Sequence, residues 1–241
     1  MTGPAMDLNA DVGERPGTDG VAADAEIITA VSSVNVACGF HAGDAETMRA
    51  VCELAVIRRK RIGAHVSHLD HEHFGRGRLD VEPDVLRDQI IQQIRALRVT
   101  ARLAGGEVTY VKPHGTVYHA AAVVAPVAEA VTGAVAAVDA SLAVLGPPGS
   151  ELLEAASARG LRFVAEGFPD RAYLPDGTLM PRSEAGSVLN EEEALTQAVR
   201  LAGDGRFRSL CIHSDTPGAV RIAVAIRNHL IGAGFEVRPF N

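Results

Sequence analysis

The sequence predicts an α/β fold in which parallel strands alternate with helices, either as a closed barrel or as a doubly wound sheet. Two observations carry this prediction. Short apolar runs of strand length recur along the whole chain, and segments with helical periodicity separate them. No linker interrupts the alternation, so the 241 residues are expected to form a single domain spanning residues 1–241.

The expected strands are short runs of small aliphatic residues. They cover residues 5–9, 33–37, 62–66, 108–112, 141–145, 162–167 and 209–213, with a weaker candidate at 236–240. The clearest helix spans 83–103, where Leu86, Ile90, Ile94 and Leu97 follow one another at helical spacing while arginines occupy the other faces. Such an apolar stripe requires a sheet to cover.

Local signals mark further elements. Asn190 with Glu193 resembles a capping box at the start of a late helix. An Ala/Val-rich helix is expected over 120–138, as core packing rather than as a membrane anchor. The segment 173–179 carries a Pro-Asp-Gly turn and predicts a small hairpin at one rim of the sheet.

Composition narrows the function classes. Lys plus Arg number 23 against 30 Asp plus Glu, which gives a net charge of −7 and none of the basic excess of a nucleic-acid binder. Cys38, Cys52 and Cys211 form no CxxC pair, which suits a reducing cytoplasm. No apolar run approaches the roughly 20 residues that span a bilayer. We expect a soluble cytoplasmic protein with neither nucleic acid nor membrane as partner.

Ionisable and amide side chains gather at the ends of the expected strands. In a parallel sheet these ends open on one face, where substrate sites form. The set comprises Asp7, Asn9, Asp11, Glu14, Asn35, His41, His65, Lys112, His114, Glu166, Asp170, Arg171, His213 and Asp215. A single such residue could equally cap a helix or be solvated in a loop. That explanation is weak for the whole set, so we expect a small-molecule site there.

Lys112 is one of two lysines in the chain, the other being Lys60. Because it ends an apolar strand, its ammonium would be partly desolvated and would need a carboxylate or an anionic substrate beside it. The strand-end candidates for that carboxylate are Asp7, Asp11 and Glu166. A purely structural ion pair is the alternative.

Histidines at strand ends suit general acid or base chemistry near neutral pH. They are His41, His65, His114 and His213. A metal held by Asp and His remains open, with Asp7, Asp11, His41 and His65 as possible ligands. The loop histidines His68, His71 and His73 lack an HExxH helix and are weaker candidates. Residues 146–150 are the nearest approach to a phosphate-binding loop, and the motif is weak.

Seven ordered motifs together resemble the LamB/YcsF family over essentially the whole chain. They lie at 7–14 (DLNADVGE), 35–44 (NVACGFHAGD), 63–65 (GAH), 74–76 (FGR), 111–115 (VKPHG), 166–171 (EGFPDR) and 211–216 (CIHSDT). The resemblance implies a distorted (β/α) barrel of seven to eight parallel strands, of the glycoside hydrolase/deacetylase type. It also implies a role, with two further subunits B and C, in opening the lactam of 5-oxoproline to L-glutamate while ATP is hydrolysed.

The resemblance also suggests roles for the strand-end set. Lys112 and Arg171 would stabilise negative charge, Glu166 or Asp11 would activate water, and His114 or His213 would protonate the departing nitrogen. The other eight would bind substrate: Asp7, Asn9, Glu14, Asn35, His41, His65, Asp170 and Asp215. ATP, with Mg, is the expected co-substrate, bound here or at a partner subunit. The alternatives are a metal-dependent amide or acetyl hydrolase of the deacetylase kind and a non-catalytic substrate-binding subunit.

Overall fold

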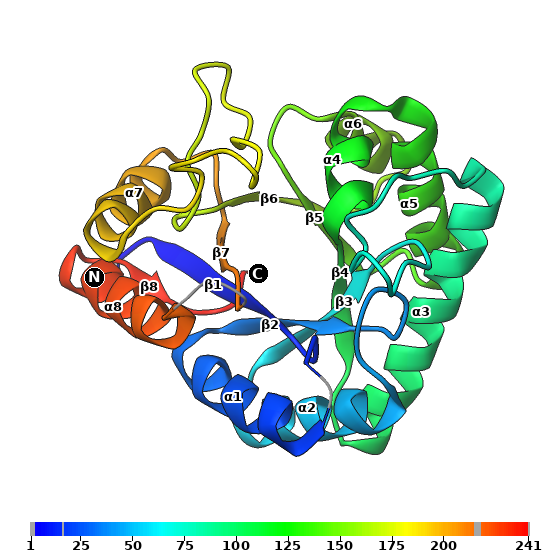
Figure 1. Cartoon of the computed structure of the whole chain (residues 1–241), viewed down its shortest axis with the longest axis horizontal. Helices are drawn as coiled ribbons and strands as arrows, with labels where there is room; N and C mark the ends of the chain where they lie inside the picture. The colour runs from blue at the N-terminus through cyan, green and yellow to red at the C-terminus, as the bar shows by residue number, and fades with distance from the viewer. Residues whose placement is uncertain (1–2, 16, 215–217, 241) are drawn as a thin grey trace.

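The computed structural model describes residues 3–15, 17–214 and 218–240. Seven parallel strands form a closed ring, because β1 pairs with β7 on one side and with β2 on the other (Figure 1). The ring strands are β1 Ala5–Val12, β2 Ser33–Ala37, β3 Arg61–Val66, β4 Val108–Pro113, β5 Ala143–Gly146, β6 Phe163–Gly167 and β7 Ser209–Ile212. A short strand β8, Glu236–Val237, pairs with the start of β1 outside the ring. The barrel prediction is confirmed, and the doubly wound alternative is wrong.

Helices surround the ring of strands (Figure 1). They are α1 Gly17–Ala30, α2 Ala45–Ile57, α3 Pro83–Leu103, α4 Gly115–Val123, α5 Ala125–Val138, α6 Glu151–Ala158, α7 Glu191–Gly203 and α8 Ala219–Gly232. On α3 the apolar stripe is fully buried at Leu86, Ile90, Ile94 and Leu97, as its spacing predicts. The main aliphatic core therefore lies between the barrel and its helical layer. A smaller apolar cluster around Tyr110 and Leu145 is separate from it, and polar side chains of β1 and β4 point into the barrel.

The expected helix over 120–138 is wrong as a single element. The chain forms two helices, α4 and α5, which are bent by 114° at the break between them. Pro126 lies in the first turn of α5, where its missing N–H is not needed. In a continuous helix its ring would clash with the carbonyl of Ala122, so the chain turns instead.

Within the described ranges, no single helix is long and apolar enough to cross a membrane. The bent pair α4 and α5 meets that criterion only when its two helices are taken together, by length and composition.

Other local predictions are confirmed. The Asn190 side chain accepts from the Glu193 N–H while Glu193 accepts from the Asn190 N–H, so α7 begins with a capping box. Tyr173 and Leu179 form an antiparallel bridge, which closes the hairpin.

Strand β1 is longer than its apolar run suggests and ends at Val12. The barrel can bury the extra residues because their polar side chains find partners inside it.

Candidate active site

Strand β1 places three polar side chains inside the barrel, because alternate residues of a strand point to the same face. Asp7 lies deepest. Its carboxylate accepts hydrogen bonds from Ser32 at 2.7 Å, from Ser33 at 2.6 Å and from Ser209. Burial raises the pKa of Asp7, and the serine hydroxyls and Arg61 offset part of that rise. Asp7 does not line the pocket described below, and Lys112 contacts other carboxylates instead.

Asn9 and Asn35 connect Asp7 to the upper end of the barrel. The Asn9 amide donates to Ser209 Oγ at 2.7 Å. The Asn35 amide donates to Asn9 Oδ1 at 2.6 Å and to Asp11 Oδ1 at 2.8 Å. The Tyr110 hydroxyl donates to Asn35 Oδ1 at 2.7 Å, which fixes the orientation of that amide. Both asparagines, predicted to bind substrate, thus position Asp11, and neither lines the pocket.

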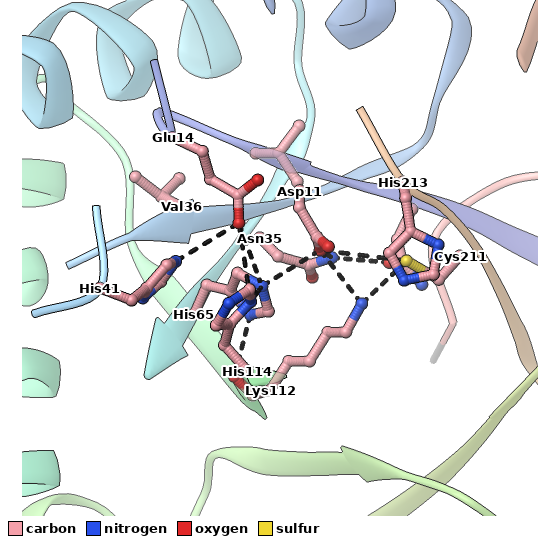
Figure 2. A network of polar contacts seen from close by, with 12 residues as sticks. Asp11, Glu14, Asn35, Val36, His41, His65, Lys112, His114, Cys211 and His213 are labelled. Carbon is pink, nitrogen blue, oxygen red and sulfur yellow. Dashed lines mark hydrogen bonds and ion pairs between the residues drawn. The ribbon is translucent and has the colours of Figure 1, made fainter. Parts of the chain in front are cut away.

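Lys112 is buried where β4 ends, with three partners around its ammonium, of which Figure 2 shows Asp11 and Cys211. Nζ lies 3.1 Å from Asp11 Oδ1, 3.5 Å from Glu166 Oε2 and 2.8 Å from Cys211 Sγ. Burial alone would lower the pKa of Lys112, but the Asp11 carboxylate raises it well above its usual range. Burial alone would raise the pKa of Asp11, but His65 and Lys112 bring it well below its usual range. Lys112 and Asp11 are therefore both charged at neutral pH.

Glu166 differs from Asp11 in its hydrogen bonding. Neither of its buried carboxylate oxygens has a hydrogen-bond partner among the described residues, and the buried Tyr118 hydroxyl also lacks one. Burial and the Glu166 charge raise the pKa of Tyr118 well above its usual range. A buried carboxylate without donors is costly in a folded protein unless a ligand or water completes it. Apart from its ion pair with Lys112 at 3.5 Å, Glu166 keeps its oxygen lone pairs for a bound molecule, whereas Asp11 also accepts the Asn35 amide.

Three histidines and Glu14 meet beside Asp11 (Figure 2). Glu14 Oε1 lies 3.3 Å from His41 Nε2, 3.7 Å from His65 Nε2 and 3.6 Å from His114 Nδ1. Burial lowers the pKa of His41 and of His114 well below the usual range, and the neighbouring histidines lower both further. These two imidazoles are neutral at neutral pH. This set could hold a metal. It shares His41 and His65 with the ligands predicted from the sequence, but it contains Glu14 and His114 in place of Asp7 and Asp11.

His213 and Asp170 form a second pair at the carboxyl ends of the strands. His213 Nδ1 lies 3.1 Å from Asp170 Oδ2, and the His213 backbone N–H donates to the same oxygen. Burial alone would raise the pKa of Asp170, but His213 brings it below its usual range. The His213 ring stacks on Phe168 with centroids 5.2 Å apart. Asp215 lies outside the described residues.

A pocket of about 340 Å³ opens over these groups. Its lining includes predicted residues from five strand ends: Asp11, His65, Lys112, His114, Arg171 and His213. Arg76 and Arg182 add positive charge to the lining, so the pocket suits an anionic molecule. Glu166 lines a neighbouring cavity of about 500 Å³, and Tyr118 lines both spaces.

Sequence reasoning missed several lining residues. Arg76 belongs to the FGR motif but was given no role, and Arg182 lies after the hairpin that follows β6. Tyr118 faces Glu166 from helix α4, one turn after His114. The sequence feature that could have indicated Tyr118 is its position one helical turn after the strand-end residue His114.

Two of the loop histidines pair with Asp70 of their own loop. His73 Nδ1 lies 3.0 Å from Asp70 Oδ1, and His68 Nε2 lies 3.6 Å from Asp70 Oδ2. The same loop contributes Phe74, whose ring meets His41 and His114 edge to face at 5.5 and 5.3 Å. The loop therefore covers the histidine cluster with an aromatic ring and contributes no imidazole to it.

A closed parallel barrel with a charged pocket at the carboxyl ends of its strands defines a class of barrel proteins that act on small molecules. The chain belongs to the LamB/YcsF family, whose model matches residues 6–241. It is 48% identical to the A subunit of the 5-oxoprolinase from Nocardia farcinica, over 98% of this chain and 99% of the relative.

Solved structures share this fold. The crystal structure of the lactam utilization protein from Thermus thermophilus superposes with a TM-score of 0.90 at 37% identity, over 98% of this chain and 100% of that one. The catalytic domain of a peptidoglycan N-acetylglucosamine deacetylase from Eubacterium rectale shares the fold at a TM-score of 0.55 and 12% identity. That match covers 99% of this chain and 89% of the deacetylase domain. The expected deacetylase-like barrel is confirmed.

Proposed function

We propose that this chain is the lactam-opening subunit of an ATP-dependent 5-oxoprolinase, which hydrolyses 5-oxoproline to L-glutamate as ATP becomes ADP and phosphate. The carrying observation is Lys112, buried between Asp11 and Glu166 next to a pocket that arginines line. The names of the relatives, a 5-oxoprolinase subunit and a lactam utilization protein, support this substrate class.

The reaction explains why the pocket carries cations. A five-membered lactam is unstrained and its nitrogen is a poor leaving group, so ring opening needs activation, for which phosphorylation of the amide oxygen is one route. Lys112 and Arg171, both buried in the pocket wall, would stabilise the negative charge that develops on oxygen or phosphate. The carboxylate of 5-oxoproline would complement Arg76 or Arg182 in the same lining.

Glu166 is the better candidate for the base that activates water. Asp11 is already engaged by Lys112 and by the Asn35 amide, and its low pKa makes it a weak base. Glu166 lies farther from the same ammonium, at 3.5 Å, and neither of its oxygens has a hydrogen-bond partner among the described residues. Glu166 would therefore accept the proton, while Asp11 keeps Lys112 charged and in place.

His213 is the better candidate for the acid that protonates the departing nitrogen. His114 Nε2 donates its proton to the Phe74 carbonyl at 2.8 Å, and its pKa is well below the usual range. The Asp170 carboxylate instead holds His213 at the rim of the pocket. This pairing resembles the general arrangement in which a carboxylate orients a catalytic imidazole.

ATP, with Mg, would bind where this chain meets its partner subunits B and C. The sequence contains no lysine-bearing phosphate loop, and the charged pocket is small for a nucleotide together with a lactam. The activated phosphoryl group would then reach Lys112 and Arg171 across that interface.

Reconstitution tests the proposal. The purified chain is mixed with its B and C partners, and glutamate release is followed with and without ATP and with each partner omitted. We expect release only from the full mixture, with ADP formed in step. Release that needs neither ATP nor partners would favour a hydrolase acting alone, of the amide or acetyl type, and would overturn the proposal.

A substitution of Lys112 distinguishes a catalytic role of this chain from a role in substrate binding alone. Lys112→Met is expected to abolish turnover in the full mixture while the isolated chain keeps some binding of 5-oxoproline, measured by calorimetry. If the variant loses binding but the saturated mixture turns over normally, the chain only binds substrate and catalysis lies in a partner.

A further inference from the structure

The cluster of Glu14, His41, His65 and His114 has the dimensions of a metal site. Each residue offers one ligand atom, and the four atoms lie within 4.8 Å of one another. Bonds of about 2.0–2.1 Å to a tetrahedral Zn²⁺ place neighbouring ligand atoms roughly 3.3–3.5 Å apart. The measured separations from Glu14 Oε1 to the three imidazole nitrogens are 3.3, 3.6 and 3.7 Å. The separations from Glu14 are therefore close to those between neighbouring ligands of one ion.

The tautomers of two of these histidines follow from their backbone partners. His65 Nδ1 lies 3.2 Å from the Lys112 carbonyl, and His114 Nε2 lies 2.8 Å from the Phe74 carbonyl. A carbonyl oxygen can only accept, so these two ring nitrogens carry the protons. In the neutral rings, the other nitrogens, His65 Nε2 and His114 Nδ1, then present lone pairs inward. This is the usual arrangement around a metal, where a carbonyl or carboxylate orients each ligating imidazole.

Those two lone pairs face each other at 3.0 Å, from His114 Nδ1 to His65 Nε2. Two acceptors at that separation, buried away from water, repel one another unless a cation lies between them. Glu14 adds a negative charge on the same side, with a side chain that is 7% exposed. A proton or a metal ion would satisfy the electrostatics of this group.

A metal ion fits the surroundings better than a shared proton does. A proton on one imidazole nitrogen can be shared with only one neighbouring acceptor, so it would leave the other ligand atoms of the cluster unsatisfied. Four ligand atoms, from residues at the ends of β1, β2, β3 and β4, are also more than one proton requires. Gly75 brings the covering loop close, since a Cβ there would lie 2.8 Å from His114 Cδ2 and 2.9 Å from His41 Cβ.

We propose that Glu14, His41, His65 and His114 bind one divalent transition-metal ion of the Zn²⁺ class at the edge of the Lys112 pocket. His65 and His114 line that pocket, so the ion is reached from the side on which substrate binds. His65 Nε2 also lies 3.4 Å from Asp11 Oδ1, which connects the metal site to the Lys112 ion pair. The proposal does not depend on the lactam-opening function.

Metal binding by the full chain tests the site directly. The protein is produced without a polyhistidine tag, its metal content is measured by elemental analysis, and it is then stripped with a chelator. Zn²⁺ is titrated back against a chromophoric chelator, and Co²⁺ is added separately as a spectroscopic probe. We expect one tight equivalent of Zn²⁺ per chain and a visible Co²⁺ spectrum of tetrahedral type. No saturable Zn²⁺ binding would overturn the proposal and assign a shared proton to the group.

Single-ligand variants locate the ion. His114→Gln and Glu14→Gln should each weaken Zn²⁺ binding by more than the roughly 10–100-fold that loss of an outer hydrogen-bond partner costs. The matched control is His73→Gln, a histidine on the covering loop whose side chain is 62% exposed and pairs with Asp70. Equal Zn²⁺ affinity in His114→Gln and His73→Gln would overturn the assignment of ligands.

A measurement on the unmodified chain guards against variants that do not fold. Zn²⁺ should raise the midpoint of thermal unfolding of the stripped wild-type chain, because an ion that binds only the folded state stabilises it. An unchanged midpoint at saturating Zn²⁺ contradicts a buried site. None of these readouts requires ATP, 5-oxoproline or partner subunits, so the metal site and the proposed function can fail separately.

Discussion

Lys112 and Asp11, which are 101 residues apart in the sequence, form a buried ion pair with Nζ 3.1 Å from Oδ1. Asp11 keeps Lys112 charged in the barrel by raising its pKa, and His65 together with Lys112 keeps Asp11 charged by lowering its pKa. Glu166 lies 3.5 Å from the same ammonium, so one cation holds two carboxylates together. Loss of that cation should affect both folding and chemistry.

Lys112→Met is expected to destabilise the chain by about 3–5 kcal/mol, the usual cost of leaving a buried charge without its partner. Urea unfolding at neutral pH measures this.

Lys112→Arg keeps the charge but replaces a compact ammonium with a planar guanidinium. The contacts of Lys112 with Asp11, Glu166 and Cys211 leave little room for that larger group. We expect a large loss of turnover in the arginine variant as well. Near-normal activity there would mean that only a diffuse positive charge is required.

Asp170 should make stability depend on acid pH. Because His213 lowers the pKa of Asp170 in the folded chain, the stabilisation is present above the ordinary Asp value of 3.8 and is lost as pH falls below it. Asp170→Asn should lower the free energy of unfolding at pH 6 and should flatten its decrease between pH 5 and pH 3. Parallel denaturation curves for the two proteins across that range would contradict the pairing.

Asp24 should have the opposite pH dependence to Asp170, with stability lost as pH rises. Burial raises its pKa to about 6, although it accepts the Gly13 backbone N–H at 2.6 Å. The folded chain therefore binds the proton of Asp24 more tightly than the unfolded chain does. Because of this, the free energy of unfolding should decrease as pH rises from about 4 to about 6. Asp24→Asn keeps a hydrogen-bond acceptor and should be about 1–3 kcal/mol more favourable at pH 7 than at pH 4, relative to wild type. Denaturation at both pH values measures this difference.

Gly75→Ala should damage the histidine cluster and the loop that covers it. Gly75 has a φ of 65°, and an added Cβ would lie 2.5 Å from Ser67 Oγ and 2.8 Å from His114 Cδ2. Gly149→Ala is the matched control, since its φ of 69° is similar but no atom lies within 4 Å of the added Cβ. The control should cost about 1–2 kcal/mol from backbone strain alone. A cost at Gly75 no larger than at Gly149 would mean that the loop can move away from the cluster.

Some elements follow from the sequence because their physics is local. The stripe on α3 needs only helical spacing, and the capping box of α7 needs only Asn190 and Glu193 at the right separation. The break between α4 and α5 was missed because apolar composition outweighed a proline that, in the first turn of a helix, starts a new one. The end of β1 was missed because Asp11 and its neighbours read as polar loop until a barrel supplies partners for them.

By itself the sequence determined the parallel pairing of the strands and the face on which the site lies, because strands alternating with helices put all strand ends on one side, and the ordered motifs added the barrel through the family resemblance. Only the tertiary structure decided how far each side chain lies along the barrel axis. That depth separates Asp7, satisfied by serines, from Asp11, which pairs with Lys112. The tertiary structure also brought Glu14 to three histidines from other strands, and their backbone partners fixed which imidazole nitrogens face inward. Distances between residues remote in sequence depend on the closure of the barrel, which no local pattern encodes.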